Sequence, residues 1–224
     1  MEATIHPFET FPGLSGVAGW TRHAFVQRVP GIDTEVDRDE ALRRLEGPHQ
    51  NVMRELGFST GKLCLAEQVH GSGVADVGPA AETKVFGAVD GLITVTLGVL
   101  LGIYVADCCA IYVADPIQHV IALLHSGKKG TELGILEVAL EQMNTSYGTQ
   151  PENVVVQLSP CIRPPAYEVD FAATIREQAL AAGVPAGQVH DDRRCTASNA
   201  DRYYSYRTEK GKTGRMLALF GLPE

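Results

Sequence analysis

Three residues of types that bind metal ions, His70, Cys108 and His125, stand at the ends of three apolar runs of the sequence. Imidazole nitrogen and thiolate sulfur are ligands that Zn²⁺ prefers in proteins. Three protein ligands leave one tetrahedral position open for water or substrate, which is the arrangement of catalytic zinc sites. Because side chains at the ends of neighbouring strands project into the same rim, the three residues could converge into one metal centre.

The same residues fit two other interpretations. Cys108 could act as a nucleophile with His125 as its base, while Asp107 or Gln68 orients the imidazole. Cysteine is also often buried as a small apolar residue, so a half-buried histidine beside core cysteines would need no metal. The residue types alone leave the metal centre, the nucleophile pair and the core interpretation open.

Two basic segments are candidate sites for an anion or a purine base. Gly127–Thr131 joins a predicted strand to a helix start, where backbone N–H groups, the helix dipole and two lysines favour an anion. A plain surface turn has the same composition, and the spacing is not that of a Walker A loop. Near the C-terminus, two arginines lie beside aromatic residues, which suits base stacking and anion binding but also aromatic core packing. The predicted substrate-binding residues are Gln68, Lys128, Lys129, Arg207 and Arg215.

The elements that must position these residues are mainly short strands. Runs rich in β-branched residues, separated by Gly, Asp and Pro, predict strands in the middle of the chain. These strands cover Lys62–Val69, Gly73–Val77, Leu92–Thr96, Val99–Ala106, Ala110–Ala114 and Val120–His125. Their close spacing implies mixed or antiparallel pairing, and each candidate metal ligand closes or directly follows one of them.

Helical spacing is confined to three parts of the chain. Val36–Leu56 is amphipathic, and Gly47-Pro48 is expected to divide it into two helices. Thr131–Gly148 and Phe171–Ala182 predict one helix each. Further strands are predicted, and they cover Val17–Phe25 as an edge strand, Val154–Leu158 and Arg215–Leu222. Runs of strands interrupted by helices favour an α+β fold over a doubly wound sheet.

Composition limits the class of protein. The 224 residues, 45% of them hydrophobic, predict one domain over residues 1–224 with a sizeable core. Nineteen Lys and Arg against 27 Asp and Glu give a net charge of -8, which argues against nucleic acid and membranes as partners. The uncharged stretch between Asp90 and Asp107 is too short to span a bilayer.

The first residues and the cysteines indicate the compartment. The N-terminal segment has no basic region followed by an apolar one, so it does not resemble a signal peptide, and we expect a cytoplasmic protein. Five cysteines form an odd set without C-x-x-C spacing, which argues against a disulfide framework and against a zinc ribbon.

Short motifs spread along the chain resemble those of one protein family. They are Gln68–Gly71, Val89–Thr94, Ala106–Cys108, Leu124–Gly127, Ser159–Ile162, Tyr167–Val169, Cys195–Thr196, Tyr204–Arg207 and Thr213–Met216. Each motif is weak alone, but in this order, from about Gly16 to Leu222, they resemble the laccase-domain family. This family is also called the multicopper polyphenol oxidoreductase or YfiH family.

The resemblance implies a single-domain α/β/β/α sandwich of mixed sheets flanked by helices, similar to the cytotoxic necrotizing factor hydrolases. It also implies zinc held by His70, Cys108 and His125. The implied activities are phosphorolysis of adenosine, inosine, guanosine and methylthioadenosine, and deamination of adenosine. Their partners are a purine nucleoside and phosphate, with Cys108, His125 and a proton-transferring Asp107 as the catalytic residues. The resemblance leaves the oligomeric state open.

Two alternatives come with the same resemblance. The similarity in fold to the necrotizing factors implies an amide hydrolase, with Cys108 as nucleophile and His125 as base, acting on an amide such as a peptidoglycan precursor. The family name implies copper and polyphenol oxidation, but three ligands cannot build the multi-copper cluster of true laccases. The chain also departs from the family where Lys128 and Lys129 replace Trp-Arg, and where the Gly-rich segment expected after His23 is missing. These departures imply a different pocket wall and a different substrate preference.

Overall fold

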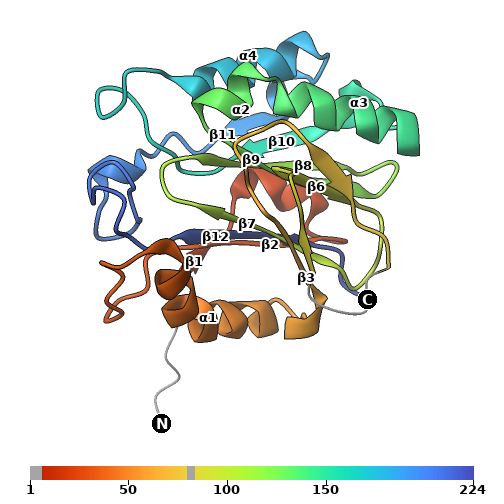
Figure 1. Cartoon of the computed structure of the whole chain (residues 1–224). Coiled ribbons are helices and arrows are strands. Elements are labelled where there is room, and N and C mark those ends of the chain that lie inside the picture. The colour runs from red at the N-terminus through yellow and green to blue at the C-terminus, as the bar shows by residue number, and fades with distance from the viewer. Residues whose placement is uncertain (1–6, 80–83) are drawn as a thin grey trace.

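Two mixed β-sheets stacked face to face, with helices on both outer faces, form the fold of the computed structural model, which describes residues 7–79 and 84–224 (Figure 1). The first sheet has the order β1 (Phe8–Glu9), β2 (Arg22–Val26), β12 (Met216–Gly221), β7 (Leu100–Val105), β3 (Leu63–Ala66) and β5 (Lys84–Phe86). The second has the order β11 (Val189–Asp191), β10 (Val155–Leu158), β8 (Cys109–Asp115), β9 (Val120–Ser126), β6 (Gly91–Thr94) and β4 (Val74–Asp76). The α-helices of the described residues are α1 (Arg38–Glu55), α2 (Lys128–Glu132), α3 (Ile135–Tyr147) and α4 (Phe171–Ala181). The predicted α+β fold and its α/β/β/α layering are confirmed.

Alternation of side chains along the central strands explains the three apolar layers. In β12, Met216, Ala218 and Phe220 belong to the core between the sheets, whereas Leu217 and Leu219 pack in the layer that also contains residues of α1. The strand β8 divides in the same way between the inter-sheet core and the layer under α3 and α4. Because both faces of these strands are buried, they are continuous apolar runs in the sequence.

The helix α1 is continuous through Pro48, so the prediction of two helices divided at Gly47-Pro48 was wrong. Proline removes one backbone hydrogen bond, at a cost of roughly 3 kcal/mol. The buried residues of α1 lie on both sides of Pro48, with Leu45 before it and Val52 after it. Burial of one apolar face along the whole helix therefore outweighs the lost hydrogen bond.

The N-terminal strand also differs from its prediction. Pro12–Val17 form a 3₁₀ helix, and β2 begins only at Arg22. This strand is not at an edge, because β1 pairs with one side of it and β12 with the other. The strand β1 has only two residues, too few to be recognised from an alternation of apolar and polar side chains.

Two short strands and one helix boundary were not predicted. The strands β5 and β11 have three residues each and pair in parallel with β3 and β10, so their neighbours stabilise them rather than any pattern of their own. The helix predicted from Thr131 begins earlier and is divided in two. Gly134 separates α2 from α3 with φ +69°, a left-handed conformation that glycine adopts at little cost.

Strand pairing brings the three candidate metal ligands to one edge. The strands β3 and β7 are parallel, so the segments that follow them, with His70 and Cys108, leave the first sheet on the same side. In the second sheet, β8 and β9 are antiparallel with Cys109 opposite Ser126, so the start of β8 lies beside the end of β9, which carries His125. The three residues therefore meet where the chain passes from one sheet to the other.

His23 on β2 gives the fold a testable dependence on pH. The residue is 8% exposed, and its Nε2 accepts a hydrogen bond from the backbone N–H of Phe11 at 2.8 Å. Burial lowers the pKa of His23 to about 4 from its ordinary value of 6.5. The unfolded chain therefore gains a proton at a higher pH than the folded chain. We expect His23 to lower the free energy of unfolding by about 2 kcal/mol between pH 6.5 and pH 5.

Chemical denaturation at these two pH values measures this contribution. In the His23→Gln protein the loss of stability on acidification should be smaller than in the wild type by about that amount. An equal loss in both proteins would show that His23 does not set this dependence.

Candidate metal centre and substrate cavity

The ligand atoms of His70, Cys108 and His125 all lie within 4.8 Å of one another. The two imidazole rings are 4.9 Å apart between centroids and nearly perpendicular, at 81°. His125 is buried, Cys108 is half-buried and His70 is exposed. Two imidazoles and a thiolate at this separation fit a zinc ion.

A fourth protein ligand is not present at this centre among residues 7–79 and 84–224. Cys109 is fully buried against Ser159 on the helix side of the second sheet, and Cys161 lies in the same apolar layer. His23 contacts Phe11 in the core. A metal held by the three residues would therefore keep one coordination position for water or substrate, as catalytic zinc sites do.

Asp90, which precedes β6 and is fully buried, holds both histidines in place. Its Oδ1 accepts a hydrogen bond from the backbone N–H of His70 at 2.9 Å and lies 2.8 Å from Nδ1 of His125. Its Oδ2 accepts from the backbone N–H of Gly71 at 2.7 Å and of Val69 at 3.1 Å. A proton on Nδ1 of His125 leaves Nε2 free to bind a metal.

Sequence reasoning did not assign Asp90 a role. The available signal was a single carboxylate directly before an apolar strand, in the run Val89–Thr94. Such a residue is buried only when backbone N–H groups or a charged partner satisfy it. The partners of Asp90 come from two other segments of the chain, so the signal is readable only in the fold.

Two of the candidate ligands, Cys108 and His125, have shifted pKa values. Burial acts to raise the pKa of the Cys108 thiol, but hydrogen bonds to His125 and His70 bring it down to about 6. Burial acts to lower the pKa of His125, but hydrogen bonds to Asp90 and Cys108 raise it to about 9. Cys108 is therefore readily deprotonated, which is the form that binds a metal.

Left-handed backbone conformations at non-glycine residues cluster around the centre. Gln68 has φ 66°, His70 has φ 59° and Asp107 has φ 82°. Each costs of order 1–3 kcal/mol and persists only where surrounding contacts hold it. The predicted strand through Val69 ends instead at Ala66, because Gln68 and His70 bend the chain into the site.

A close contact of the backbone completes the centre. A Cβ atom added to Gly127 would lie 2.7 Å from Sγ of Cys108, so only glycine fits at this position.

Asp107 lines the same cavity as Cys108, contrary to simple alternation of neighbouring residues. Its left-handed backbone lies before β8 begins, so the period of the strand does not apply. The carboxylate accepts hydrogen bonds from the hydroxyls of Thr196 at 2.7 Å and Ser205 at 3.0 Å, and from the backbone N–H of Arg207 at 2.7 Å. Asp107 thus fixes the C-terminal loop against the site.

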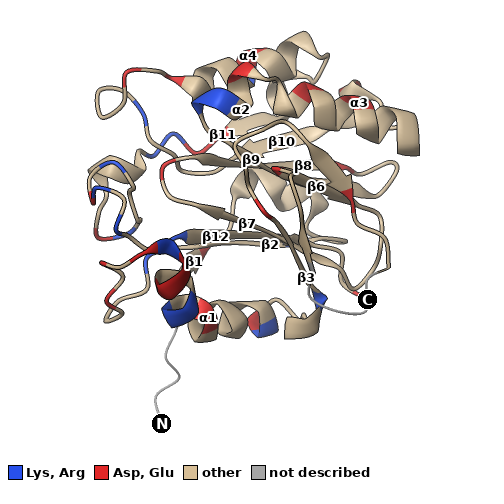
Figure 2. Cartoon of the chain, viewed as in Figure 1, with Lys and Arg blue, Asp and Glu red and all other residues tan. Residues whose placement is uncertain are grey.

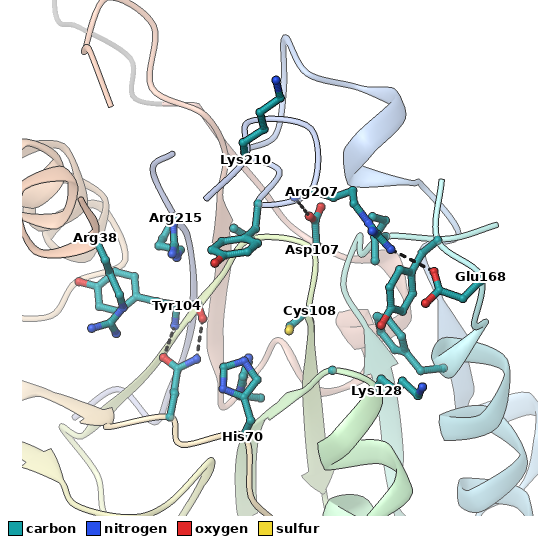
Figure 3. A pocket seen from close by; sticks show the side chains of 18 of the residues that line it. Arg38, His70, Tyr104, Asp107, Cys108, Lys128, Glu168, Arg207, Lys210 and Arg215 are labelled. Atoms are coloured by element: carbon teal, nitrogen blue, oxygen red, sulfur yellow. Dashed lines mark hydrogen bonds and ion pairs between the residues drawn. The ribbon is translucent and has the colours of Figure 1, made fainter. Parts of the chain in front are cut away.

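A cavity of about 930 Å³ opens over the metal centre and has room for a nucleoside and an anion (Figure 3). It brings together most of the residues predicted from the sequence. Those that line it are His70, Cys108, His125, Asp107, Gln68, Lys128, Arg207 and Arg215.

Two of the predicted substrate-binding residues, Lys129 and Gln68, are not free to bind a substrate in the cavity as predicted. Lys129 is exposed and does not line the cavity, because the first turn of α2 directs only Lys128 toward it. Gln68 lines the cavity, but its amide is bonded to the backbone of Tyr104, with Nε2 donating to the carbonyl at 2.6 Å and Oε1 accepting from the N–H at 3.0 Å. Gln68 therefore ties the His70 loop to β7.

Several cavity residues were not assigned a role from the sequence, either because they lie outside the motifs or because their motif gave no sign of a substrate contact. These additional lining residues include Arg38, Glu67, Tyr104, Tyr167, Glu168, Phe171, Tyr206 and Lys210. Figure 2 shows Lys and Arg segments at α2, in the loops before β12 and at the start of α1, all along the same edge of the molecule. The cavity is thus basic although the chain is acidic overall.

Comparison with known proteins identifies the family. A family model described as multi-copper polyphenol oxidoreductase laccase matches residues 31–173 and 169–223. The chain belongs to this laccase family. It is 33% identical to a purine nucleoside phosphorylase of Deinococcus radiodurans over 90% of its length and 89% of that protein. It is 32% identical to the purine nucleoside phosphorylase YlmD of Geobacillus stearothermophilus over 95% of its length and 92% of that protein.

Two solved structures have the same fold as this chain. The crystal structure of YlmD from Geobacillus stearothermophilus matches with a TM-score of 0.83 at 25% identity, covering 96% of this chain and 94% of that one. YfiH of Bacillus licheniformis matches with a TM-score of 0.81 at 20% identity, covering 97% and 100%. The family resemblance drawn from the motifs is confirmed. In the described part of the chain, no helix has both the length and the apolar character needed to cross a bilayer.

Proposed function

We propose that this protein is a zinc-dependent purine nucleoside phosphorylase that also deaminates adenosine. The observation that carries the proposal is an open His-Cys-His centre at the base of a basic cavity of nucleoside size. Relatives that match nearly the whole chain bear the name purine nucleoside phosphorylase, which supports the same reaction class here. Adenosine, inosine, guanosine and methylthioadenosine are the proposed nucleosides, with phosphate as the second substrate.

The metal and its ligands would have one task. His70, Cys108 and His125 would hold a zinc ion, which would supply Lewis-acid chemistry at the base of the cavity. The bond between Asp90 and Nδ1 of His125 would leave Nε2 of that ring for the ion. The exposed position of His70 places the centre in contact with whatever fills the cavity.

The cavity walls would bind and orient the nucleoside. Tyr167 and Phe171 supply aromatic surface, and the guanidinium of Arg207 lies 5.0 Å from the centre of the Tyr167 ring. Lys128 adds a positive charge at the start of α2. The hydrogen bonds that engage Asp107 favour a positioning role for this carboxylate over the proton transfer expected from the sequence.

The test is a product analysis of zinc-loaded protein incubated with adenosine, with and without phosphate. Adenine that forms only with phosphate reports phosphorolysis, inosine reports deamination, and hypoxanthine reports both in sequence. We expect the His70→Ala protein to lose both activities, since it lacks one metal ligand. Failure of the wild-type protein to form any of these products above the His70→Ala background would contradict the proposed function.

An amide hydrolase is the second candidate, because Cys108 and His125 lie together at the base of the cavity. The pKa of Cys108 is lowered and that of His125 is raised, which are the directions expected of a nucleophile and its base. A thiolate bound to zinc is not free to attack, so metal content separates the two functions. Amide hydrolysis by metal-free protein, abolished by alkylation of Cys108, would support the hydrolase.

The polyphenol oxidase implied by the family name needs a separate measurement. Oxygen uptake with a phenol substrate by copper-loaded protein would reveal it directly. The three ligands found among the described residues provide for one metal ion and not for a copper cluster.

A further inference from the structure

Two arginines face the cavity from elements far apart in the sequence. Arg38 is the first residue of α1, and Arg215 immediately precedes β12. Figure 3 shows both beside Tyr104, on one side of His70, with Arg207 and Glu168 on the other side. The cavity thus has a basic end that is separate from the Tyr167 end.

The guanidinium of Arg215 is held rigidly by the backbone. Its Nη1 donates to the carbonyls of Thr213 at 2.8 Å and Gly214 at 3.0 Å. Its planar group also lies 5.8 Å from the centre of the Tyr206 ring. A guanidinium fixed in this way has little rotational freedom to lose when it binds a ligand.

The charge of this pair is not balanced by the protein. No carboxylate of residues 7–79 or 84–224 forms an ion pair with Arg215, and the ion pair of Arg38 is a 3.7 Å contact with the highly exposed Asp39. Arg207, at the other end, is paired with Glu168 at 3.0 Å. Of the three guanidiniums that line the cavity, those of Arg38 and Arg215 are therefore the ones whose charge the protein leaves largely unbalanced.

The electrostatic environment agrees with this geometry. Burial lowers the pKa of Arg215, and the positive charge of Arg38 lowers it further. Burial raises the pKa of the Tyr104 phenol to about 12, and the charge of Arg38 partly opposes that rise. Two guanidiniums brought together in a half-enclosed space repel each other, and an anion between them would remove the repulsion.

We propose that Arg38 and Arg215 form the subsite for a tetrahedral oxyanion, and that its occupant is the inorganic phosphate that attacks the nucleoside. This assignment rests on the proposed function. Guanidiniums bind phosphate oxygens in pairs, and their position beside His70 leaves the Tyr167 end of the cavity for the purine. In phosphorolysis a phosphate oxygen forms a bond to C1′ of the ribose, the bond from C1′ to the purine nitrogen breaks, and the purine leaves with that electron pair and takes up a proton.

Calorimetric titration of the zinc-loaded protein with inorganic phosphate tests the subsite without relying on activity. We expect Arg38→Gln to raise the Kd for phosphate by about tenfold or more, because it removes a charge-assisted hydrogen bond. Arg43→Gln is the matched control, since it removes the same charge from the same helix and Arg43 does not line the cavity. In steady-state assays, Arg38→Gln should raise the KM for phosphate and leave the KM for adenosine unchanged.

The outcomes separate this inference from the proposed function. Suppose that phosphate binding weakens in Arg38→Gln but not in Arg43→Gln, and that the wild-type protein has no phosphorylase activity. This result would support the oxyanion subsite and contradict the proposed function. Phosphorolysis by Arg38→Gln with an unchanged KM for phosphate supports the function and overturns the subsite.

A third outcome concerns the source of the oxyanion. Adenosine 5′-monophosphate could bind more tightly than adenosine in the wild type and lose this advantage in Arg38→Gln. If phosphate binding were then independent of Arg38, the pair would hold the phosphate of a nucleotide, and the assignment to the attacking phosphate would be overturned.

Discussion

Asp90→Asn is expected to lower the metal affinity of the protein by about 10- to 100-fold, although Asp90 is not one of the three candidate ligands. The carboxylate of Asp90 accepts four hydrogen bonds, one from His125 and three from the backbone of the His70 loop. Asparagine keeps one acceptor oxygen and replaces the other with an NH₂ group, which would face N–H donors. The loop would then lose its left-handed conformation at His70, and His125 would lose the bond that sets its tautomer.

Metal content after dialysis against a weak chelator, measured by elemental analysis, checks this expectation. Asp115→Asn is a matched control, because Asp115 is also fully buried and accepts bonds from the backbone N–H groups of Ile117 and Gln118, at the far end of β8. Both variants should be less stable than the wild type, but only Asp90→Asn should lose metal. Equal metal retention in the two variants would show that Asp90 does not position the ligands.

Cys108→Ala is expected to abolish stoichiometric zinc binding, and His125→Ala should do the same. Each removes one of three ligands whose donor atoms lie within 4.8 Å of one another. Cys109→Ala should keep the metal, because Cys109 is fully buried in the apolar layer under the helices and contacts Ser159. Its truncation should cost at most a few kcal/mol of unfolding free energy.

The comparison of adjacent cysteines is the sharpest form of this test. Both variants remove one thiol, so differences in thiol content do not explain a difference in zinc. We expect the two variants to differ in which measurement changes. Cys108→Ala should lose zinc per chain, whereas Cys109→Ala should keep its zinc and mainly show a lower denaturation midpoint. Stoichiometric zinc in the Cys108→Ala protein would place the metal elsewhere and remove the basis of the proposed mechanism.

Local pattern was enough for most strands and for the choice of the three candidate metal ligands. The apolar runs that became β7, β8 and β9 are buried on both faces, so their composition alone separates them from loops. Histidine and cysteine are rare enough at strand ends that His70, Cys108 and His125 could be selected by type. The motif pattern then predicted the family and the α/β/β/α layering that the structure has.

Features that depend on contacts between distant segments were decided only by the tertiary structure. Pro48 stays inside one helix because α1 buries an apolar face on both sides of it. The position of α1 also brings Arg38 to the cavity, whereas Lys129 turns away although it adjoins Lys128. Asp90 acquires its role from a loop of the first sheet and a strand of the second. A sequence records the type and spacing of such residues, but their partners follow from strand pairing and sheet stacking, which no local pattern contains.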